Sequence, residues 1–256
     1  MRSGKTIIDN MYKSTFIIVS NKEIATRSYR LRLMGNCYGH IPEPGQFVDI
    51  AIPGFYLRRP ISVCDADNLS ITLIYKTVGG GTEALSRMKE GDTVELLLPL
   101  GHGFTPEACK DKALLVGGGL GSAPMYFLAK TLLEQGKQVS VVLGFNRSDE
   151  IVLQSEFRSL GIEPVIATMD GSAGVKGFVT DAIRQTAPEF DFFYCCGPMP
   201  MMSSLCRTLD CHGEASLEER MGCGAGFCYG CSCHTTVGTK RICKDGPVFK
   251  KEEIVW

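Results

Sequence analysis

Three cysteines crowd into one glycine-rich stretch near the C-terminus, and a fourth follows a short distance later. Cys223, Cys228 and Cys231 have the spacing C-x₄-C-x₂-C, and Cys243 completes the set. Three sulfurs can converge from one short loop only if the backbone turns sharply, which glycine permits because it reaches φ > 0 without steric cost. The spacing predicts four thiolates around a [2Fe–2S] core. The glycines that free this loop are Gly222, Gly224, Gly226 and Gly230.

Other uses of these thiols remain open. Zinc prefers two C-x₂₋₄-C knuckles, and here only Cys228-x-x-Cys231 has that form. A disulfide cluster requires an oxidising compartment, of which the sequence shows no sign. Cys233 lies in the same stretch, and we expect it to be a buried residue that does not bind the cluster.

Composition narrows the class of protein. The 256 residues suit one large or two ordinary domains, and 27 basic residues nearly balance 28 acidic ones, which disfavours a nucleic-acid or membrane-surface protein. The N-terminal residues are too polar for a signal peptide, and no apolar run approaches the length of a membrane span. Twelve cysteines without a secretion signal indicate a reducing compartment. We therefore expect a soluble cytoplasmic protein.

Short strands follow one another closely in the first hundred residues. Alternating apolar and polar residues, as in Tyr29–Leu33, are typical of strands with one face in water. Six strands with little helix predict a closed or nearly closed antiparallel barrel. One helix is expected at Thr82–Met88, with Thr82 as its N-cap. The other predicted strands are Phe16–Ser20, Phe47–Ala51, Ile61–Cys64, Leu69–Tyr75 and Val94–Leu98.

Two features of this half exceed what a barrel requires. Arg58 and Arg59 precede a proline-stiffened segment that ends at Ser62, and a guanidinium fork can bind a pyrophosphate bidentately. Gly79-Gly-Gly81 then leads into a helix, where free backbone N–H groups can receive an anion. Each feature also has an ordinary interpretation, as an exposed arginine pair or a flexible turn. Because they flank the strand Ile71–Lys76, together they can line one phosphate-bearing cofactor.

The pattern changes after about Pro106 to alternating strands and helices. The apolar run Ala113–Val116 is typical of a buried parallel strand, and the helix-like Ala123–Leu133 follows it. This alternation predicts a doubly wound parallel sheet with right-handed crossovers. The remaining elements are expected at Val139–Gly144, Asp149–Leu160, Glu163–Thr168, Thr180–Gln185 and Phe192–Cys195, with a last helix through Leu209.

A glycine-rich turn joins the first strand of this sheet to its helix. Gly117 and Gly119 fit the first two positions of the dinucleotide-binding fingerprint, but the third falls on Ser122. The strand before the turn and the helix after it favour nucleotide binding. The turn residues expected to bind the nucleotide are Gly117, Gly118, Gly119 and Gly121.

The residues at the ends of two strands indicate where a nicotinamide cofactor would bind and whether it would be NAD or NADP. Cys196-Gly197-Pro198 follows a strand at the carboxyl edge, where such sheets bind ligands, and we expect it to flank a nicotinamide. No acidic residue ends the second strand, where Gly144-Phe-Asn-Arg147 stands. The choice between NAD and NADP therefore stays open, because Arg147 can meet either a 2′-phosphate or only solvent.

These parts together resemble the ferredoxin–NADP reductase superfamily. Its Arg-x-Tyr-Ser motif is met by Arg59-Pro60-Ile61-Ser62, with isoleucine at the tyrosine position, and Tyr75 can take the missing flavin contact. The C-terminal Glu219-Arg-Met-Gly-Cys223 and Arg241-Ile-Cys243-Lys-Asp-Gly-Pro-Val-Phe249 narrow the resemblance to the electron-transfer subunits of class B dihydroorotate dehydrogenases, over about residues 17 to 249.

The resemblance implies three domains and their cofactors. These are an FAD-binding barrel (1–105), an NAD-binding α/β domain (106–213) and a [2Fe–2S] domain (214–256), with the cluster on the four cysteines. Lys76 stands where arginine is expected, so it keeps the charge but loses the fork. The residues implied for FAD are Arg59, Pro60, Ile61, Ser62, Ile74, Tyr75, Lys76, Gly81 and Thr82.

The resemblance also implies a function. A partner subunit carrying FMN would oxidise dihydroorotate, and electrons would pass through the cluster and FAD of this chain to NAD⁺ in pyrimidine (UMP) biosynthesis. Two such chains around a partner dimer would form a heterotetramer. The sequence offers no Cys, Ser or Lys constellation as a base for dihydroorotate, so we expect no catalytic residue for that oxidation in this chain. The alternatives are a diaphorase subunit of a hydrogenase or sulfide dehydrogenase, and a non-catalytic zinc-stabilised assembly subunit.

Overall fold

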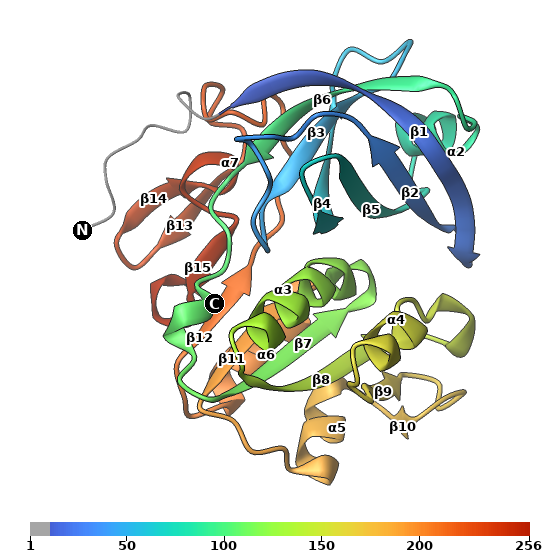
Figure 1. Cartoon of the computed structure of the whole chain (residues 1–256). Coiled ribbons are helices and arrows are strands. Elements are labelled where there is room, and N and C mark those ends of the chain that lie inside the picture. Colours follow the sequence, from blue (N-terminus) through green and yellow to red (C-terminus); the bar gives the residue numbers. More distant parts are fainter. Residues whose placement is uncertain (1–10) are drawn as a thin grey trace.

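A β-barrel lies against an α/β layer, and the C-terminal segment runs beside both (Figure 1). The structure is a computed structural model that describes residues 11–256. The first ten residues, on which the signal-peptide argument rests, lie outside the described residues. Within the described part of the chain, no helix is long and apolar enough to cross a membrane.

Six antiparallel strands close the barrel in the order β1-β2-β5-β4-β3-β6. Their apolar positions point inward, and Phe16, Leu31, Leu73 and Leu96 are all fully buried there. The predicted closed barrel is confirmed, because alternation along each strand provides one apolar face for the interior. The bounds are β1 Tyr12–Ala25, β2 Ser28–Met34, β3 Phe47–Ala51, β4 Arg59–Ala66, β5 Ser70–Lys76 and β6 Thr93–Leu100.

The helix after β5 begins earlier than the sequence predicted. Helix α2 spans Gly80–Ser86, and Gly79 is its N-cap. Thr82 is the third helical residue, and its hydroxyl accepts the backbone N–H of Val78 at 2.9 Å and of Gly79 at 3.3 Å. The prediction of Thr82 as N-cap is therefore wrong. A hydroxyl at this position reaches back to the orphan N–H groups that precede the helix.

The α/β layer is a seven-stranded sheet in the order β10-β9-β8-β7-β11-β12-β15. Helices α3 and α4 pack with the barrel side of the sheet, whereas α5 and α6 pack on the opposite face. This is the predicted doubly wound arrangement. The strands are β7 Lys112–Gly118, β8 Gln138–Phe145, β9 Val165–Thr168, β10 Val175–Lys176, β11 Phe192–Cys196, β12 Gly213–Ser216 and β15 Val248–Lys250. The helices are α3 Ser122–Glu134, α4 Gln154–Ser159, α5 Val179–Thr186 and α6 Met199–Thr208.

The predicted helix over Asp149–Leu160 is interrupted. A 3₁₀ turn, η3, covers Ser148–Glu150, and α4 starts only at Gln154. Between them Leu153 has a left-handed backbone, with φ at 65°. The buried side chains of Val152 and Leu153 explain the break, since an uninterrupted helix would carry them along a different face. The turn brings η3 back to the barrel.

The last segment of the chain takes part in the same sheet. Strand β12 pairs in parallel with β11, and β15 adds to β12 in antiparallel register, with Phe249 opposite Ala215. Between them lie the cysteine loop, a hairpin and a short helix. These are β13 Ser232–Thr235, β14 Gly238–Arg241 and α7 Ile242–Asp245. The sheet therefore continues into the residues expected to form the cluster domain.

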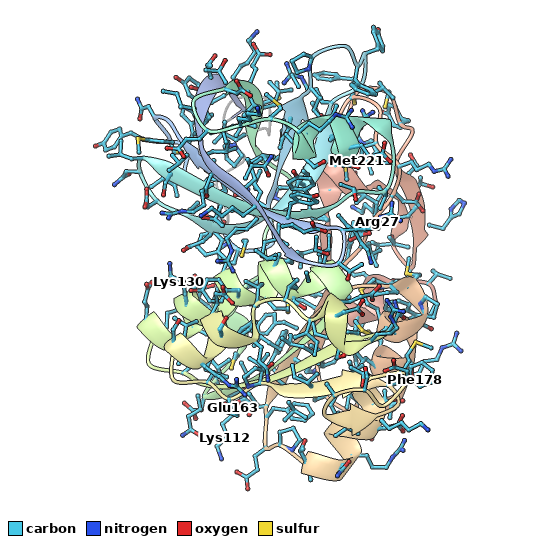
Figure 2. The ribbon with its side chains drawn as sticks, turned by 90° about the vertical axis from the view of Figure 1, so that its right-hand side faces the viewer. Arg27, Lys112, Lys130, Glu163, Phe178 and Met221 are labelled. Carbon is cyan, nitrogen blue, oxygen red and sulfur yellow. The ribbon has the colours of Figure 1, made fainter. Side chains whose placement is uncertain are left out.

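Polar contacts join the barrel to the α/β layer. Lys130 of α3 lies at this seam in Figure 2, and its ammonium is 2.6 Å from the Asp65 carboxylate of β4. The β1–β2 turn meets η3, where Thr26 donates its backbone N–H to the Asp149 carbonyl at 3.0 Å. The two layers are thus bonded at several points around the cofactor elements.

Asp191 provides a test of stability against pH. Burial alone would raise the pKa of Asp191, but the backbone N–H groups of Lys110, Asp111 and Lys112 outweigh it and lower the pKa to about 2. A depressed carboxyl pKa stabilises the folded state above the unfolded pKa of 3.8, and this contribution is lost as the pH falls toward 2. We expect Asp191→Asn to lower the free energy of unfolding at pH 7 by about 1 kcal/mol, after allowing for screening at this exposed site. Chemical denaturation at pH 7 and pH 2 checks this, because the difference between the proteins should shrink at pH 2.

Candidate cofactor sites

The barrel brings Arg59 and the loop Gly79–Gly81 together. The sequence analysis expected these two features to line one phosphate-bearing cofactor. Arg59 begins β4, and its guanidinium lies 5.2 Å from the ring centre of Phe55. A Cβ atom on Gly81 would come within 2.6 Å of the Arg59 Cζ. The missing side chain at position 81 is therefore what lets the guanidinium lie against the loop. This cradle fits a phosphate-bearing group such as that of FAD.

The side chains of the other residues expected to bind FAD point in different directions, some toward the α/β layer and some into the core. Lys76, at the end of β5, extends to the α/β layer, where its ammonium is 3.1 Å from Glu150. Ile61 and Ile74 are buried in the core clusters, and Ser62 is half-buried beside Phe47 across the strand pair. Ile61 and Ile74 thus offer a cofactor their backbone rather than their side chains.

Tyr75 does not present its ring to the outside. The ring is 2% exposed, stacks on Tyr29 at 5.5 Å, and donates its hydroxyl to Asn21 Oδ1 at 2.9 Å. Burial raises the pKa of Tyr75 well above its ordinary value. The expected flavin contact from the Tyr75 ring is corrected accordingly, because the ring is committed to the barrel core. Only the backbone at this position is left for a flavin.

The two nucleotide loops of the sheet pack directly on one another. A Cβ on Gly121 would come within 2.8 Å of the Gly197 nitrogen, and one on Gly197 within 2.9 Å of Gly118. Gly119 has a φ of 54°, and Gly117 lies against the Ser122 backbone. The structure thus places the Gly117–Gly121 turn beside Cys196–Pro198 at the carboxyl edge of β7 and β11. Only glycine allows backbones to approach this closely.

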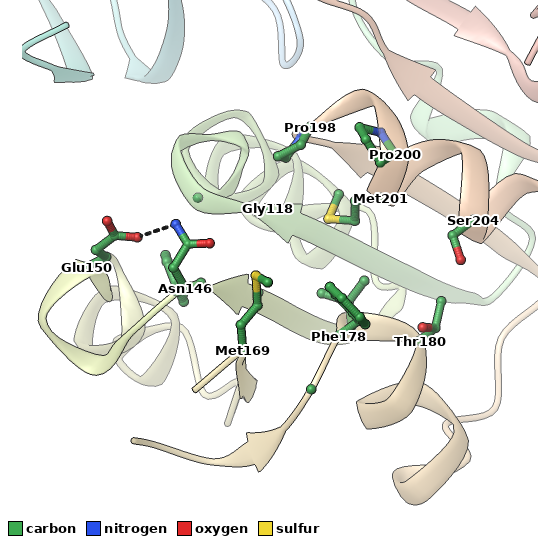
Figure 3. A pocket seen from close by; sticks show the side chains of 15 residues that line it. Gly118, Asn146, Glu150, Met169, Phe178, Thr180, Pro198, Pro200, Met201 and Ser204 are labelled. Atoms are coloured by element: carbon green, nitrogen blue, oxygen red, sulfur yellow. Dashed lines mark hydrogen bonds between the residues drawn. The ribbon is translucent and has the colours of Figure 1, made fainter. Parts of the chain in front are cut away.

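A cavity of about 480 Å³ opens at this edge (Figure 3). Gly118, Gly119 and Pro198 line it, as expected, and Figure 3 shows the bond between Asn146 and Glu150 at one end. Sequence analysis missed most of the wall, which comes from the ends of other strands and helices. The missed residues are Glu150, Met169, Gly177, Phe178, Val179, Thr180, Pro200, Met201 and Ser204. The carboxyl-edge rule, applied to β9 as well, would have found Met169.

Two side chains near the cavity are less accessible to a bound ligand than their positions in the sequence suggested. The Cys196 thiol is 2% exposed, and burial raises its pKa to about 12, so it stays protonated. Arg147 is paired with Asp149 through two bonds, from Nε at 3.1 Å and from an Nη at 2.7 Å. Its charge is therefore balanced within its own turn.

The four predicted cluster ligands lie as two pairs. The sulfurs of Cys231 and Cys243 are 3.2 Å apart, and the thiols of Cys223 and Cys228 interact with each other. Among residues 11–256, no three His, Cys, Asp or Glu side chains gather closely enough for a single metal ion. Two pairs suit a two-iron core, in which four cysteines are shared between the irons.

Backbone donors surround these sulfurs. Cys223 Sγ accepts N–H groups from Phe227 at 3.2 Å and Cys228 at 3.4 Å, and Cys231 Sγ accepts that of Cys243 at 3.4 Å. Burial opposes ionisation of Cys223, but its hydrogen bonds prevail and lower the pKa to about 7. Backbone N–H groups that donate to ligand sulfurs stabilise thiolates and tune the potential of an iron–sulfur cluster. The donor set therefore fits the implied cluster.

The cysteine loop packs on the barrel over a buried carboxylate. A Cβ on Gly224, which has a φ of 61°, would come within 2.6 Å of Asp49 Oδ2 in β3. Asp49 is 2% exposed, and its Oδ1 has no hydrogen-bond partner within residues 11–256. Burial raises the pKa of Asp49 to about 6, against the lowering effect of Arg58 and Arg59. The cysteine loop and the arginine segment thus share one patch of the barrel.

Cys233 and the nearby cations also have defined places. Cys233 lies in β13 opposite Lys240 and is half-buried, whereas the sequence analysis expected it to be buried. Partial burial still raises the pKa of its thiol. Arg241 donates to the Gly226 carbonyl at 2.8 Å and lies 4.7 Å above the Tyr229 ring. Arg241 is therefore bonded to the cysteine loop rather than free in solvent.

Family comparisons agree with this architecture. Residues 218–255 match the iron–sulfur cluster binding domain of dihydroorotate dehydrogenase B, and residues 115–207 match the oxidoreductase NAD-binding domain. Two curated relatives are named dihydroorotate dehydrogenase B (NAD(+)), electron transfer subunit, from Bacillus mycoides (strain KBAB4) and Bacillus cereus (strain Q1). Each is 42% identical over 258 aligned positions, which cover 96% of this chain and 99% of the relative.

Solved structures show the same fold. An NADH-dependent reduced ferredoxin-NADP oxidoreductase, described for flavin-based electron bifurcation, is 33% identical with a TM-score of 0.83 and covers 95% of this chain and 90% of its own. Phthalate dioxygenase reductase is 19% identical with a TM-score of 0.68, over 91% and 89% of the two chains, and shows the fold alone.

The barrel, the nucleotide-binding sheet and the four-cysteine loop together define an oxidoreductase of the ferredoxin reductase type, whose cofactors are FAD, NAD and a [2Fe–2S] cluster. Within that class the identity over nearly the whole length is decisive. The chain belongs to the family of electron transfer subunits of dihydroorotate dehydrogenase B (NAD(+)).

Proposed function

We propose that this chain transfers electrons to NAD⁺ from a separate subunit that carries FMN and oxidises dihydroorotate, in UMP biosynthesis in the cytoplasm. The contiguity of its three sites supports the proposal. The cysteine loop rests on β3 through Gly224 and Asp49, the Arg59 cradle lies on the same barrel, and Lys76 of that barrel is bonded to Glu150 in the NAD cavity. A path between a protein partner and NAD needs such an arrangement.

Each predicted residue has a proposed role. Arg59 and the backbone at Gly81 hold the FAD phosphates, the backbone of 74–76 belongs to the same FAD site, and the turn Gly117–Gly121 with Cys196–Pro198 holds NAD. The four cysteines hold the cluster, two on each iron. When bound, the cluster exchanges single electrons while NAD takes two as hydride, and the flavin supplies the conversion between them.

The side chains of this chain bind and orient rather than react. Arg59 presents a fork to an anion, which fixes orientation as well as affinity. The protonated Cys196 thiol offers no base at neutral pH, since its pKa is about 12. Dihydroorotate oxidation therefore falls to the partner. We further propose two such chains around a partner dimer, and domain limits of 1–105, 106–213 and 214–256.

Reconstitution tests the proposal. The purified chain should contain FAD, iron and sulfide in the ratio of one flavin to one cluster, and NADH should bleach its flavin absorbance. NAD⁺ reduction by dihydroorotate should appear only when the FMN subunit is added. Dihydroorotate oxidation by this chain alone contradicts the division of labour, and zinc without flavin supports the assembly-subunit alternative.

The 33% identical NADH-dependent reduced ferredoxin-NADP oxidoreductase favours a second candidate, a reductase subunit with a different partner. Capture of the chain from its host separates the two. A co-purifying FMN protein that oxidises dihydroorotate supports the first proposal, and a ferredoxin-linked, hydrogenase or sulfide dehydrogenase partner supports the second.

A further inference from the structure

Arg241 links the two chain segments that carry the cluster ligands. Three of the cysteines belong to the loop that begins at Cys223, whereas Cys243 lies in α7, after the hairpin β13–β14. Arg241 ends β14, and its guanidinium reaches back to the loop, where Nη1 donates to the Gly226 carbonyl at 2.8 Å. Its side chain is 18% exposed. One mostly buried cation therefore connects the two segments that have to meet around the cluster.

Two further contacts fix this guanidinium. Its Cζ lies 4.7 Å from the ring centre of Tyr229, and its Nε lies 3.3 Å from Asp245 Oδ2. The same carboxylate oxygen accepts the Arg241 backbone N–H at 2.8 Å, which closes the pair within a few residues of chain. A carbonyl, an aromatic ring and a carboxylate thus hold one planar group. Such an arrangement suits arginine and does not suit lysine.

The cysteine loop has an unfavourable backbone at the residue that Arg241 covers. Tyr229 has a φ of 58°, in the left-handed region that is unfavourable for residues other than glycine. The cation over its ring favours this conformation. The stem of Lys244 also packs on the loop, because a Cβ on Gly226 would come within 2.7 Å of Lys244 Cδ. The loop is therefore held in shape by residues on either side of the fourth cysteine.

The charges of Arg241 and Asp245 affect the redox chemistry that the cluster supplies. Four thiolates give a [2Fe–2S] core a net negative charge, and one-electron reduction adds one more. A fixed cation beside the loop therefore favours the reduced form, and a fixed carboxylate disfavours it. Screening is weaker here than in bulk water, because the two side chains are only 18% and 27% exposed. Since the two charges are paired, each partly offsets the other, and removing one leaves the other unbalanced.

We infer that Arg241 and Asp245 are positioning residues of the cluster, which together close the cysteine loop on the Cys243 segment and set the reduction potential by their opposite charges. Neither residue belongs to the predicted ligand set. The inference deepens the proposed function, since it takes the four cysteines as the ligands, but it makes no use of the partner subunit.

Two variants that each remove one charge test the inference. Arg241→Gln should lower the reduction potential and Asp245→Asn should raise it. Each shift should be about tenfold in the ratio of reduced to oxidised cluster at a fixed potential, which is about 59 mV for one electron. Redox titration of the purified, cluster-loaded chain, followed by electron paramagnetic resonance, measures both shifts at one pH. A purely structural role would move both potentials in the same direction. Shifts of the same sign, or an unchanged potential in either variant, overturn the inference.

Arg241→Lys separates the loop contact from the charge. Lysine keeps the charge, so the potential should stay near that of the wild type, but it cannot hold the Gly226 carbonyl and Asp245 together through a planar fork. A chelator should therefore remove iron from this variant about tenfold faster, because a charge-assisted hydrogen bond is lost. An unchanged rate of iron loss contradicts the proposed closing of the loop.

A remote charge provides the matched control. Arg158→Gln breaks an exposed pair with Glu163 and should change neither the potential nor the rate of iron loss. If Arg241→Gln takes up no cluster, the potential of Asp245→Asn decides, since a rise supports the inference and no change overturns it.

Neither measurement needs the partner, because the potential and the loss of iron are properties of this chain alone. A chain with the expected shifts that accepts no electrons from a dihydroorotate-oxidising subunit counts against the proposed function alone. A chain that works with that subunit, although both variants keep the wild-type potential, counts against the inference alone.

Discussion

Serine in place of any one of Cys223, Cys228, Cys231 or Cys243 is expected to remove most of the iron and sulfide from the protein. The sulfurs lie in two interacting pairs, so each substitution leaves one iron with a single thiolate. Serine is a poor substitute because its oxygen is a harder ligand than sulfur, and iron–sulfur clusters are held by thiolates. Iron and sulfide analysis, with the visible absorbance of the cluster, measures the loss.

Cys233→Ser is the matched control for this result. Cys233 lies in the same stretch but in strand β13, where it pairs with Lys240 across the hairpin. The variant should keep its cluster. Loss of iron from Cys233→Ser as complete as from Cys231→Ser would show that the ligand set is wrong.

Gly81→Ala is expected to weaken FAD binding by about fivefold or more, since overpacking of this kind typically costs about 1–3 kcal/mol. The new Cβ would come within 2.6 Å of the Arg59 Cζ and force the guanidinium out of its place. Titration of the apoprotein with FAD, followed by flavin fluorescence, gives the dissociation constant.

Gly80→Ala separates this effect from a general response of the loop. Its Cβ would meet nothing closer than the Phe55 ring at 3.4 Å, which is ordinary contact, and alanine favours the helix. FAD affinity should stay near that of the wild type. Equal affinities of the two variants would mean that Arg59 does not hold the cofactor from this position.

The parts of the fold that could be predicted are those with a local signal. The alternation in Tyr29–Leu33 and the apolar run Ala113–Val116 report directly which faces are buried, and barrel and sheet followed from them. The cysteine spacing is local too, because three of the ligands come from one loop. The helix break at Leu153 had no such signal, since burial of its side chain depends on the folded sheet.

The parts that could not be predicted depend on contacts between distant segments. Strands β12 and β15 are only 4 and 3 residues long, and pairing with β11 rather than their own pattern makes them strands. Lys76 was correctly noted as a charge, but its bond to Glu150 spans 74 positions of sequence.

The shared sheet has a consequence for how fast electrons can move. Because β12 and β15 bracket the cysteine loop and pair within the nucleotide-binding sheet, the loop is not hung on a linker that must swing between donor and acceptor. Its separation from the barrel is set once, when the chain folds. Transfer inside this subunit would then depend on fixed tunnelling distances and not on the motion of a tethered domain.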